Sequence, residues 1–422
     1  MDYLKSNQTL LVIGKVWPEP NSSAAGTRIL QIIHIFQKQN FEIVFCSAAK
    51  KSEFSVDLGS KNITTKPIKL NNSSFDDFLS NLKPDVVLFD RFMTEEQFGW
   101  RVAEKVPEAI RILDTEDLHF LRRARELSLK KGAINGSDFY SHLNNDVMVR
   151  ELASILRCDV TIMISEFEIE ILMEEFKIAR RKLLHLPLMV KNEDMMDADI
   201  LPTFNQRHNF VSIGNFLHPP NLDSVRYLKE QIWPKIRKSI PDSECHIYGA
   251  YPDLKVLNLD SPDIGFLIKG RANDVSETLS IYKVMLAPLR FGAGQKGKLL
   301  DAMIAGLPSV TTKIGAEGMC SKKEWPGYIC DDRDAFADQA IRLYSDHYVW
   351  LKMQSNIKPV LDTNFNLEKF TKQFLNDLTD FMATMNRSTD YFGAVLNYQT
   401  HHAAKYLGKW IEEKNNGNSH HE

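Results

Sequence analysis

The segment Pro288–Gly318 concentrates glycines and cations where an apolar run, Val284–Ala287, gives way to a helical pattern. Glycines without Cβ atoms let backbone N–H groups approach an anion closely. The start of the helix, near Lys296, adds partial positive charge, and Lys298 adds a whole charge. These residue types in this order favour a diphosphate site. A glycine-rich strand-to-helix turn with solvated lysines is the alternative on these residues alone.

A second group of polar residues follows the apolar run Ile110–Leu113, and it contains Glu116, Asp117 and His119. The carboxyl ends of parallel strands face the ligand crevice of an α/β sheet. A carboxylate or the imidazole there could orient an acceptor hydroxyl or take its proton. The alternative is a helix N-terminal cap, for which acidic residues are also favoured.

Several other chemistries lack their patterns. No Gly-Lys-Ser or Gly-Lys-Thr follows the glycines, so the turn is not a P-loop. The first strand is followed by Gly14-Lys15-Val16-Trp17 rather than the dinucleotide fingerprint, which argues against a nicotinamide dehydrogenase. No nucleophile elbow of the G-x-S-x-G type is present. We expect no bound metal and no cofactor besides a nucleotide-sugar co-substrate.

The elements that position these residues read as two parallel sheets. Continuous apolar runs separated by amphipathic stretches are typical of strands buried on both faces by helices. In the first half the runs are Leu10–Ile13, Phe41–Cys46, Val86–Phe89, Ile110–Leu113, Val160–Ile164 and Leu183–Leu186. In the second half they are Phe210–Gly214, His246–Gly249, Gly265–Ile268, Val284–Ala287 and Ser309–Thr312.

A polar, acidic segment separates the two series, and it predicts a linker. We expect a first Rossmann-like domain over residues 1–190, a linker over 191–208 and a second Rossmann-like domain over 209–384. The tail, about 385–422, is expected to cross back to the first domain. The linker would be the hinge of domain closure.

The overall composition is that of a folded protein, with 43% hydrophobic and 25% charged residues and a net charge of −3. We therefore expect no nucleic-acid partner. The five scattered cysteines favour a reducing compartment, and no apolar run is long enough for a signal or a membrane span, so we expect a cytoplasmic protein. Basic clusters at 122–131 and 177–182 are solvated helix faces or a peripheral contact with a membrane.

Pro288–Gly318 resembles the hallmark segment of glycosyltransferase family 4, the glycosyl transferases group 1. Phe210–Gly249 is similar to the first strand, helix and second strand of that family's donor domain. Trp17–Arg28 and Thr161–Phe176 resemble its first domain more loosely. The resemblance implies the GT-B fold, in which two doubly wound Rossmann-like domains face each other across a cleft, and a metal-independent transfer of a sugar with retention at the anomeric carbon.

The resemblance also implies individual roles. Asp301 stands where the family binds the donor ribose, and Ala293 replaces the glutamate that usually holds the donor sugar. Asp117 matches the family's aspartate after the strand, with Glu116 in place of its histidine. The residues expected on the donor side are Gly26, Gly270, Arg271, Arg290, Gly292, Gly294, Lys296, Lys298 and Asp301, and those expected to be catalytic are Glu116, Asp117 and His119.

Two other functions fit the same fold. A catalytically silent module could bind a nucleotide sugar or scaffold a partner enzyme, which the replacement at Ala293 and the aspartate at Asp301 would permit. A hydrolase or epimerase could act on a nucleotide sugar without an acceptor. The acceptor, whether a glycan, a lipid-linked sugar or a small molecule, is not specified by the residues.

Overall fold

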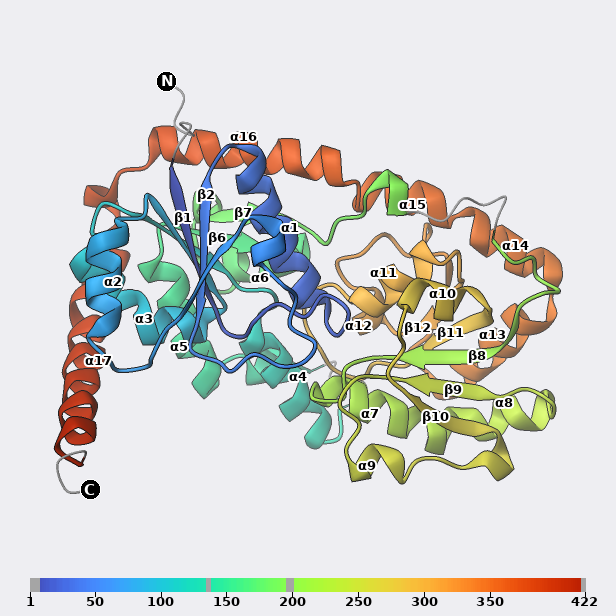
Figure 1. Cartoon of the computed structure of the whole chain (residues 1–422). Helices are drawn as coiled ribbons and strands as arrows, with labels where there is room; N and C mark the ends of the chain where they lie inside the picture. The colour runs from blue at the N-terminus through green and yellow to red at the C-terminus, as the bar shows by residue number, and fades with distance from the viewer. Residues whose placement is uncertain (1–7, 134–137, 195–200, 419–422) are drawn as a thin grey trace.

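The computed structural model describes residues 8–133, 138–194 and 201–418. These residues form two α/β domains that lie side by side, with each domain built around one parallel sheet (Figure 1). The predicted alternation of buried strands and covering helices is confirmed in both halves. Part of the expected linker, residues 195–200, lies outside the described residues.

The first sheet has seven strands in the order β3-β2-β1-β4-β5-β6-β7, and all neighbouring strands are parallel. Its strands are β1 (Thr9–Gly14), β2 (Glu42–Ser47), β3 (Thr64–Pro67), β4 (Val86–Asp90), β5 (Ile110–Asp114), β6 (Val160–Met163) and β7 (Leu183–His185). The β1 side chains from Leu10 to Ile13 are fully buried, as continuous apolar runs require when helices cover both faces. The edge strand β3 was not predicted, because its sequence is polar.

Helices cover both faces of this sheet. They are α1 (Ala24–Lys38), α2 (Ser74–Leu82), α3 (Phe92–Lys105), α4 (His119–Lys130), α5 (Asp146–Arg157) and α6 (Glu166–Glu174). The start of α1 is fixed by Ser23, whose hydroxyl accepts a hydrogen bond from the N–H of Gly26. The start of α5 is fixed in the same way by Asn145.

The second sheet has six parallel strands in the order β10-β9-β8-β11-β12-β13. Its strands are β8 (His208–Ile213), β9 (Cys245–Tyr248), β10 (Phe266–Gly270), β11 (Tyr282–Ala287), β12 (Ser309–Thr311) and β13 (Gly327–Ile329). The helices of this domain are α7 (Pro219–Tyr227), α8 (Trp233–Ser239), α9 (Leu254–Leu257), α10 (Val275–Ser280), α11 (Gly297–Ile304), α12 (Lys313–Ala316), α13 (Arg333–Ser345), α14 (His347–Ser355) and α15 (Ile357–Asn364). In both sheets the order reverses beside the first strand of the domain, and at such a point the carboxyl ends of the strands leave a crevice.

The chain returns to the first domain earlier than we expected. We placed the returning tail at about residue 385, but helix α16 (Leu367–Thr384) already lies on the first domain (Figure 1). Its buried residues Phe370, Phe374 and Leu378 pack in the core cluster that contains the first strand. Helix α17 (Tyr391–Asn418) then packs against α3 and α5 at the end of the first domain remote from the second.

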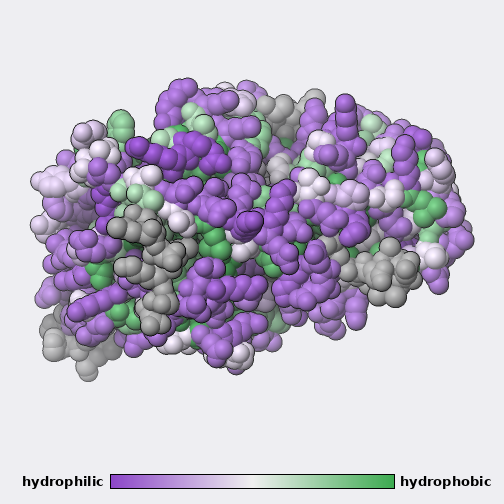
Figure 2. Space-filling view, turned by 90° about the horizontal axis from the view of Figure 1, so that it is seen from above, coloured by the Kyte–Doolittle hydropathy of each residue, from purple (hydrophilic) through white to green (hydrophobic). Residues whose placement is uncertain are grey.

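The outer surface gives no sign of a membrane-spanning segment. Among the helices of the described ranges, none is both long and apolar enough to cross a bilayer. Seen from above, the molecule is mainly hydrophilic, and the hydrophobic residues on this face are scattered rather than gathered (Figure 2). Several large apolar side chains of α17, including Tyr398 and Trp410, are exposed at the end of the first domain.

Candidate active site in the interdomain cleft

A cavity of about 810 Å³ lies between the two domains. Its first-domain wall is formed by the segments after β1, β4 and β5, and its second-domain wall by the segments after β8 and β9 and by α10 and α11. The cavity therefore lies outside the carboxyl ends of both sheets, where ligands of open α/β sheets bind.

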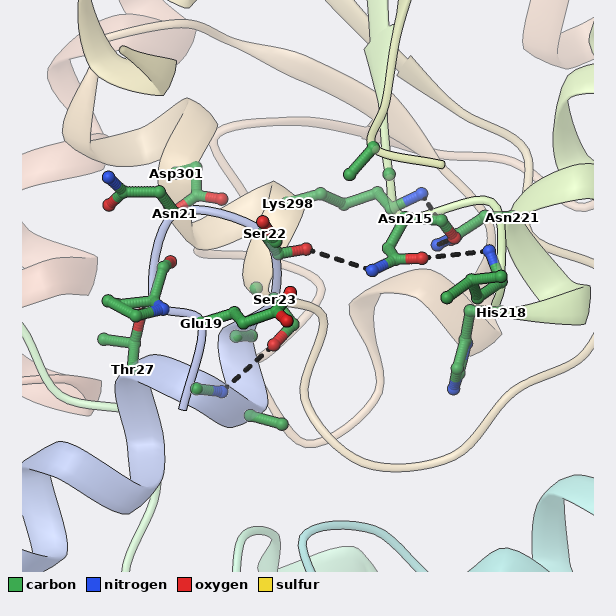
Figure 3. Close-up of a pocket in the computed structure, with 18 of the residues that line it drawn as sticks. Glu19, Asn21, Ser22, Ser23, Thr27, Asn215, His218, Asn221, Lys298 and Asp301 are labelled. Atoms are coloured by element: carbon green, nitrogen blue, oxygen red, sulfur yellow. Dashed lines mark hydrogen bonds between the residues drawn. The ribbon is translucent and has the colours of Figure 1, made fainter. Parts of the chain in front are cut away.

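The start of α11 lies in the second-domain wall of the cavity. No side chain caps this helix, and Gly297 and Lys298, its first two residues, both line the cavity. The Nζ of Lys298 donates a hydrogen bond of 2.7 Å to the Oδ1 of Asn221, and among the described residues no carboxylate lies within 4.0 Å of this ammonium. Figure 3 shows the side chain of Lys298 extending toward Asn221 of the second domain. An uncapped helix start beside a cation is suited to binding an anion.

Burial shifts the pKa values of the charged side chains here toward neutrality. It lowers the pKa of Lys298 to about 7, and the neighbouring charge of Lys296 adds to the decrease. It lowers the pKa of Lys296 to about 8. It raises the pKa of Asp301 to about 7, against the attraction of Lys298. A ligand with negative charge beside Lys298 would offset the cost of burying its ammonium, whereas a neutral ligand would not.

The glycine-rich turn before α11 is partly occupied by protein groups. The N–H of Gly294 donates a hydrogen bond of 2.8 Å to the Oε1 of Glu168 from the first domain. The Nζ of Lys296 donates to the carbonyl oxygens of Ala293 and Gly294. Two groups that we expected to bind phosphate thus have partners in the protein, and the groups left facing the cavity are the helix start and Lys298.

Gly294 also sets the distance between the domains. Its φ is +64°, and a Cβ at this position would lie 2.8 Å from the Cβ of Asp117 across the cleft. Gly297 is comparable, because its Cβ would lie 2.4 Å from that of Ala24. Glycines at these two positions let the turn rest directly on the first domain.

We therefore expect Gly294→Ala to destabilise the protein by more than the cost of the left-handed backbone alone. That cost is about 1–2 kcal/mol for a residue with a Cβ. Gly270→Ala is the matched control, because Gly270 has a φ of +74° and its Cβ would meet nothing within 4 Å. Thermal unfolding of both variants measures the difference. Equal decreases in the melting temperatures of the two variants would show that Asp117 moves aside without a loss of stability.

On the first-domain wall, Glu116, Asp117 and His119 come together beside this turn. The Nε2 of His119 lies 3.2 Å from one oxygen of Asp117, and Arg122 donates a hydrogen bond of 2.7 Å to the other. Glu116 has a φ of +66° and lies 3.6 Å from the Nε of Arg91. A non-glycine residue in this conformation is strained, and strain of this kind is concentrated at functional sites.

The three side chains differ in their protonation. Burial raises the pKa of Glu116 to about 7, a rise that Arg91 opposes and Asp117 increases. Asp117 is also buried, but Arg122 and His119 hold its pKa well below the usual range. Burial lowers the pKa of His119. Glu116 is thus the group whose pKa lies near neutral pH, as a general base requires.

The same three residues have the geometry of a metal-ligand set, since their ligand-type atoms lie within 4.8 Å of one another. Arg91 and Arg122 adjoin this cluster, however, and Arg122 already holds the carboxylate of Asp117. A cation in this place would have to compete with guanidinium groups. The arrangement fits an orienting and proton-accepting cluster better than a metal centre.

Two buried carboxyl groups of the first domain support this wall, and we did not predict either of them. Glu151 accepts hydrogen bonds from the N–H groups of His119 and Phe120 and thereby caps α4. Glu168 accepts from the N–H of Leu118 as well as from Gly294, and burial with the nearby Asp117 raises its pKa to about 8. In the sequence both glutamates look like solvated helix residues, so no signal marked them.

Further hydrogen bonds and an ion pair join the two domains across the cleft. Arg125 binds both carboxylate oxygens of Glu317, at 2.8 and 2.7 Å, and the carbonyl oxygen of Gly292 at 2.8 Å. Asn215 donates a hydrogen bond of 3.3 Å to the carbonyl oxygen of Ser22, as Figure 3 shows. The cavity is therefore bounded by paired groups of both domains.

The remaining predicted donor-side residues divide into two sets. Gly26 and Arg271 line the cavity, although Gly26 is also required locally, because a Cβ there would lie 2.5 Å from the backbone of Glu19. Gly270 and Arg290 are not among the lining residues. Arg290 is held outside the cleft by an ion pair with Asp223 of α7. Gly292, Lys296, Lys298 and Asp301 line the cavity together with the three predicted catalytic residues.

The predicted basic clusters consist largely of paired side chains. Arg123 and Lys130 both bind Glu126, Arg125 binds Glu317 across the cleft, and Lys182 binds Asp390. These pairs fit helix faces and interdomain contacts. A peripheral membrane contact through these clusters stays a prediction.

Comparison with known proteins finds a family match in the second domain and one curated relative. Residues 207–346 match the family model described as glycosyl transferases group 1. One curated relative, N-acetyl-alpha-D-glucosaminyl L-malate synthase of Bacillus anthracis, is 27% identical over 170 residues. The match covers 37% of this chain and 43% of that protein, so it spans less than half of the relative's length.

Solved structures match both domains. A glycosyltransferase from Rickettsia africae is 12% identical and superposes with a TM-score of 0.65, covering 90% of this chain and 100% of that one. Sucrose-phosphate synthase from Thermosynechococcus elongatus is 13% identical, with a TM-score of 0.67 over 89% of this chain and 100% of that one. The Anabaena protein HepE in complex with UDP-glucose is 10% identical, with a TM-score of 0.63 over the same shares. The predicted GT-B fold is confirmed.

Proposed function

We propose that this chain, whose residues 207–346 match the family model of the glycosyl transferases group 1, transfers a sugar from a nucleotide-sugar donor to an acceptor bound on the first domain. The observation that carries the proposal is the uncapped start of α11 at the cavity, where Lys298 lines the wall and has no carboxylate partner within the described residues. The diphosphate of a nucleotide sugar supplies the negative charge that this arrangement lacks.

In the proposed reaction the bond between the anomeric carbon and the diphosphate oxygen breaks, and its electron pair leaves with the diphosphate. The acceptor oxygen forms the new bond on the same face of the sugar, so that the anomeric configuration is retained. The N–H groups at the start of α11 and Lys298 stabilise the departing charge. Glu116, beside the glycine-rich turn, accepts the hydrogen bond and the proton of the acceptor hydroxyl.

In this mechanism protein groups alone stabilise the negative charge of the leaving diphosphate, and we propose that transfer requires no metal. Asp301 is proposed to bind the donor ribose, and Arg271 to frame the base. Uridine is the first base to test, because the similar structure of HepE contains UDP-glucose. The name of the curated relative makes N-acetylglucosamine one of the sugars to test.

A binding module without transfer remains the second candidate. Two observations favour it. The N–H of Gly294 donates its hydrogen bond to Glu168. Ala293, which stands in the place of the family's sugar-binding glutamate, is buried in a first-domain core cluster. A donor could then bind without being held for reaction. Turnover separates the two candidates, because a module of this kind binds a nucleotide sugar and releases nothing.

The proposed function is tested with a panel of UDP-, GDP- and ADP-glucose and UDP-N-acetylglucosamine, each incubated with the protein and candidate acceptors, with and without a chelator. We expect nucleotide release from one donor, unchanged by the chelator, and an acceptor whose mass rises by one sugar residue. Release without a heavier product would indicate a hydrolase or epimerase. Tight binding of a donor with no release from any would favour the silent module and contradict the proposal.

A further inference from the structure

A cation pair lies on the first-domain wall of the cavity, opposite α11. Lys15 follows β1 and Arg91 follows β4, and both line the cavity beside Glu116. Neighbouring parallel strands bring these two positions together, because β1 pairs with β4 in register. Lys15 is not among the residues that we predicted for the site.

The ammonium of Lys15 forms no ion pair with any residue that the structure describes. Its Nζ donates only a hydrogen bond of 3.3 Å to the thioether sulfur of Met93, which is a weak acceptor. Within the described ranges no carboxylate lies within 4.0 Å of it. The carboxylate of Asp90, the residue before Arg91, binds the backbone of Lys15 rather than its ammonium: its Oδ2 accepts a hydrogen bond from the backbone N–H of Lys15.

Arg91 is also incompletely satisfied. Its Nε lies 3.7 Å from Asp90 and 3.6 Å from Glu116, both beyond a good hydrogen bond, and this buried atom has no hydrogen-bond partner. Its backbone has a φ of +71°, so that two strained non-glycine residues, Arg91 and Glu116, face each other at the ends of adjacent strands. Strain persists where the surrounding structure and function require the conformation.

The surrounding charges act differently on the two cations: burial lowers the pKa of Arg91, but the carboxylates of Asp90, Glu116, Asp117 and Asp114 raise it by more, whereas the pKa of Lys15 is lowered. Burial lowers the pKa of Lys15, and the like charges of Arg91 and Arg122 lower it further while Asp90 and Glu116 oppose them. The carboxylate of Asp117 lies 2.7 Å from Arg122 and 3.2 Å from His119 and is not among the groups that raise the pKa of Lys15. An anion placed between Lys15 and Arg91 would relieve this repulsion and satisfy the free Nε.

We propose that Lys15 and Arg91 bind an anionic group of the acceptor, a carboxylate or a phosphate, and so select acceptors that carry one. The inference rests on the proposed function, because it assigns this wall to the acceptor. An acceptor anchored at Arg91 would have its hydroxyl within reach of Glu116, which lies 3.6 Å from the same guanidinium. The cation pair therefore fixes the acceptor, and Lys298 on the opposite wall fixes the donor.

The test uses three small probes that share hydroxyl groups: glycerol 3-phosphate, glycerate and uncharged glycerol. Each is titrated into the full chain saturated with UDP, so that the donor's phosphate site is filled, and thermal unfolding reports binding. We expect one or both anions to raise the melting temperature in a concentration-dependent way and glycerol to have no such effect. Which anion acts distinguishes a phosphate-bearing from a carboxylate-bearing acceptor.

Lys15→Met is expected to weaken the binding of the effective anion at least about tenfold, equivalent to about 1.4 kcal/mol, while leaving the affinity for UDP unchanged. Lys255→Met is the matched control, because Lys255 is an exposed lysine of α9 outside the cavity. The inference is overturned if the wild type does not distinguish the anions from glycerol, or if Lys15→Met binds them as the wild type does. It is also overturned if Lys15→Met weakens UDP binding equally, since the pair would then serve the donor's diphosphate.

The two proposals fail separately. If no donor of the panel releases its nucleotide, the proposed function fails whatever the anions do. If a donor is turned over but Lys15→Met leaves anion binding intact, the acceptor inference alone fails.

Discussion

Lys298→Met is expected to lower kcat/KM for the nucleotide-sugar donor about 10²–10³-fold, the loss usual when one preorganised group that stabilises developing negative charge is removed. Lys298 lies at the uncapped start of α11, where negative charge would develop on the leaving diphosphate. Steady-state kinetics with the donor identified by the panel measures the effect. Lys255→Met, an exposed lysine outside the cavity, serves as control.

The folded protein should tolerate this change. Burial lowers the pKa of Lys298 to about 7, so the folded state binds this proton less tightly than the unfolded state does, and below the unfolded pKa the ammonium opposes folding. We therefore expect a melting temperature at least equal to that of the wild type. A variant that loses both activity and stability would show that Lys298 has a structural role through its hydrogen bond to Asn221.

The same group predicts how UDP binding depends on pH. A bound diphosphate raises the pKa of Lys298 above about 7, so UDP affinity should fall as the pH rises from neutrality, because the ammonium is then lost from the free protein. In Lys298→Met this part of the pH dependence should disappear. Wild-type kinetics in the variant, or an unchanged pH dependence of UDP binding, would remove Lys298 from the donor site.

Glu116→Gln is expected to lower kcat about 10²–10⁴-fold while changing the KM for the donor little, because a general base contributes in the transition state and Glu116 lies on the acceptor wall. Glutamine keeps the size of the side chain and its positive φ while removing the proton acceptor. Initial rates at saturating donor and varied acceptor separate kcat from KM. Glu413→Gln, on the exposed part of α17, is the matched control.

The pH profile distinguishes catalysis from support of the fold. The pKa of Glu116 is raised to about 7, and a base acts only when ionised, so wild-type kcat/KM for the acceptor should rise with pH through about 7. Glu116→Gln should lack this rise. Unchanged kinetics in the variant would show that Glu116 is not the catalytic base.

The sequence identified the frame of the site well, because its signals are local. A short run such as Leu10–Ile13, in alternation with amphipathic stretches, is typical of a strand buried on both faces, and the turn before α11 follows from Gly292 and Gly294. Short polar strands escaped the same reasoning. β3 contains Thr64–Pro67, whose polar side chains lie at the edge of the first sheet and need no apolar pattern.

Contacts across the cleft could not be predicted, since they join residues far apart in the chain. Arg125 appeared to belong to a basic helix face, yet it binds Glu317, 192 positions away. Glu168 appeared to be one of several helix glutamates, yet it is fully buried and binds Gly294. Arg290 was expected in the donor site, but Asp223 holds it elsewhere. The contacts of Arg125 and Glu168 depend on the approach of the two domains, and the pair of Arg290 with Asp223 joins two distant segments of the second domain; no local pattern encodes either kind of contact.

The replacement at Ala293 illustrates both the use and the limit of a family resemblance. The sequence showed that the glutamate usual in the family is missing, but it did not show what the alanine does. In the structure Ala293 packs in a core cluster of first-domain residues. Ala293 also lines the cavity, so the alanine leaves an apolar surface where the family's glutamate would place a carboxylate.

A crystal structure of the protein with UDP would test the central claim most directly. The account predicts that the diphosphate lies at the start of α11, within hydrogen-bonding distance of the N–H groups of Gly297 and Lys298 and of the ammonium of Lys298, with the ribose hydroxyls on Asp301. A diphosphate bound elsewhere, with the start of α11 and Lys298 left without contact to it, would contradict the account.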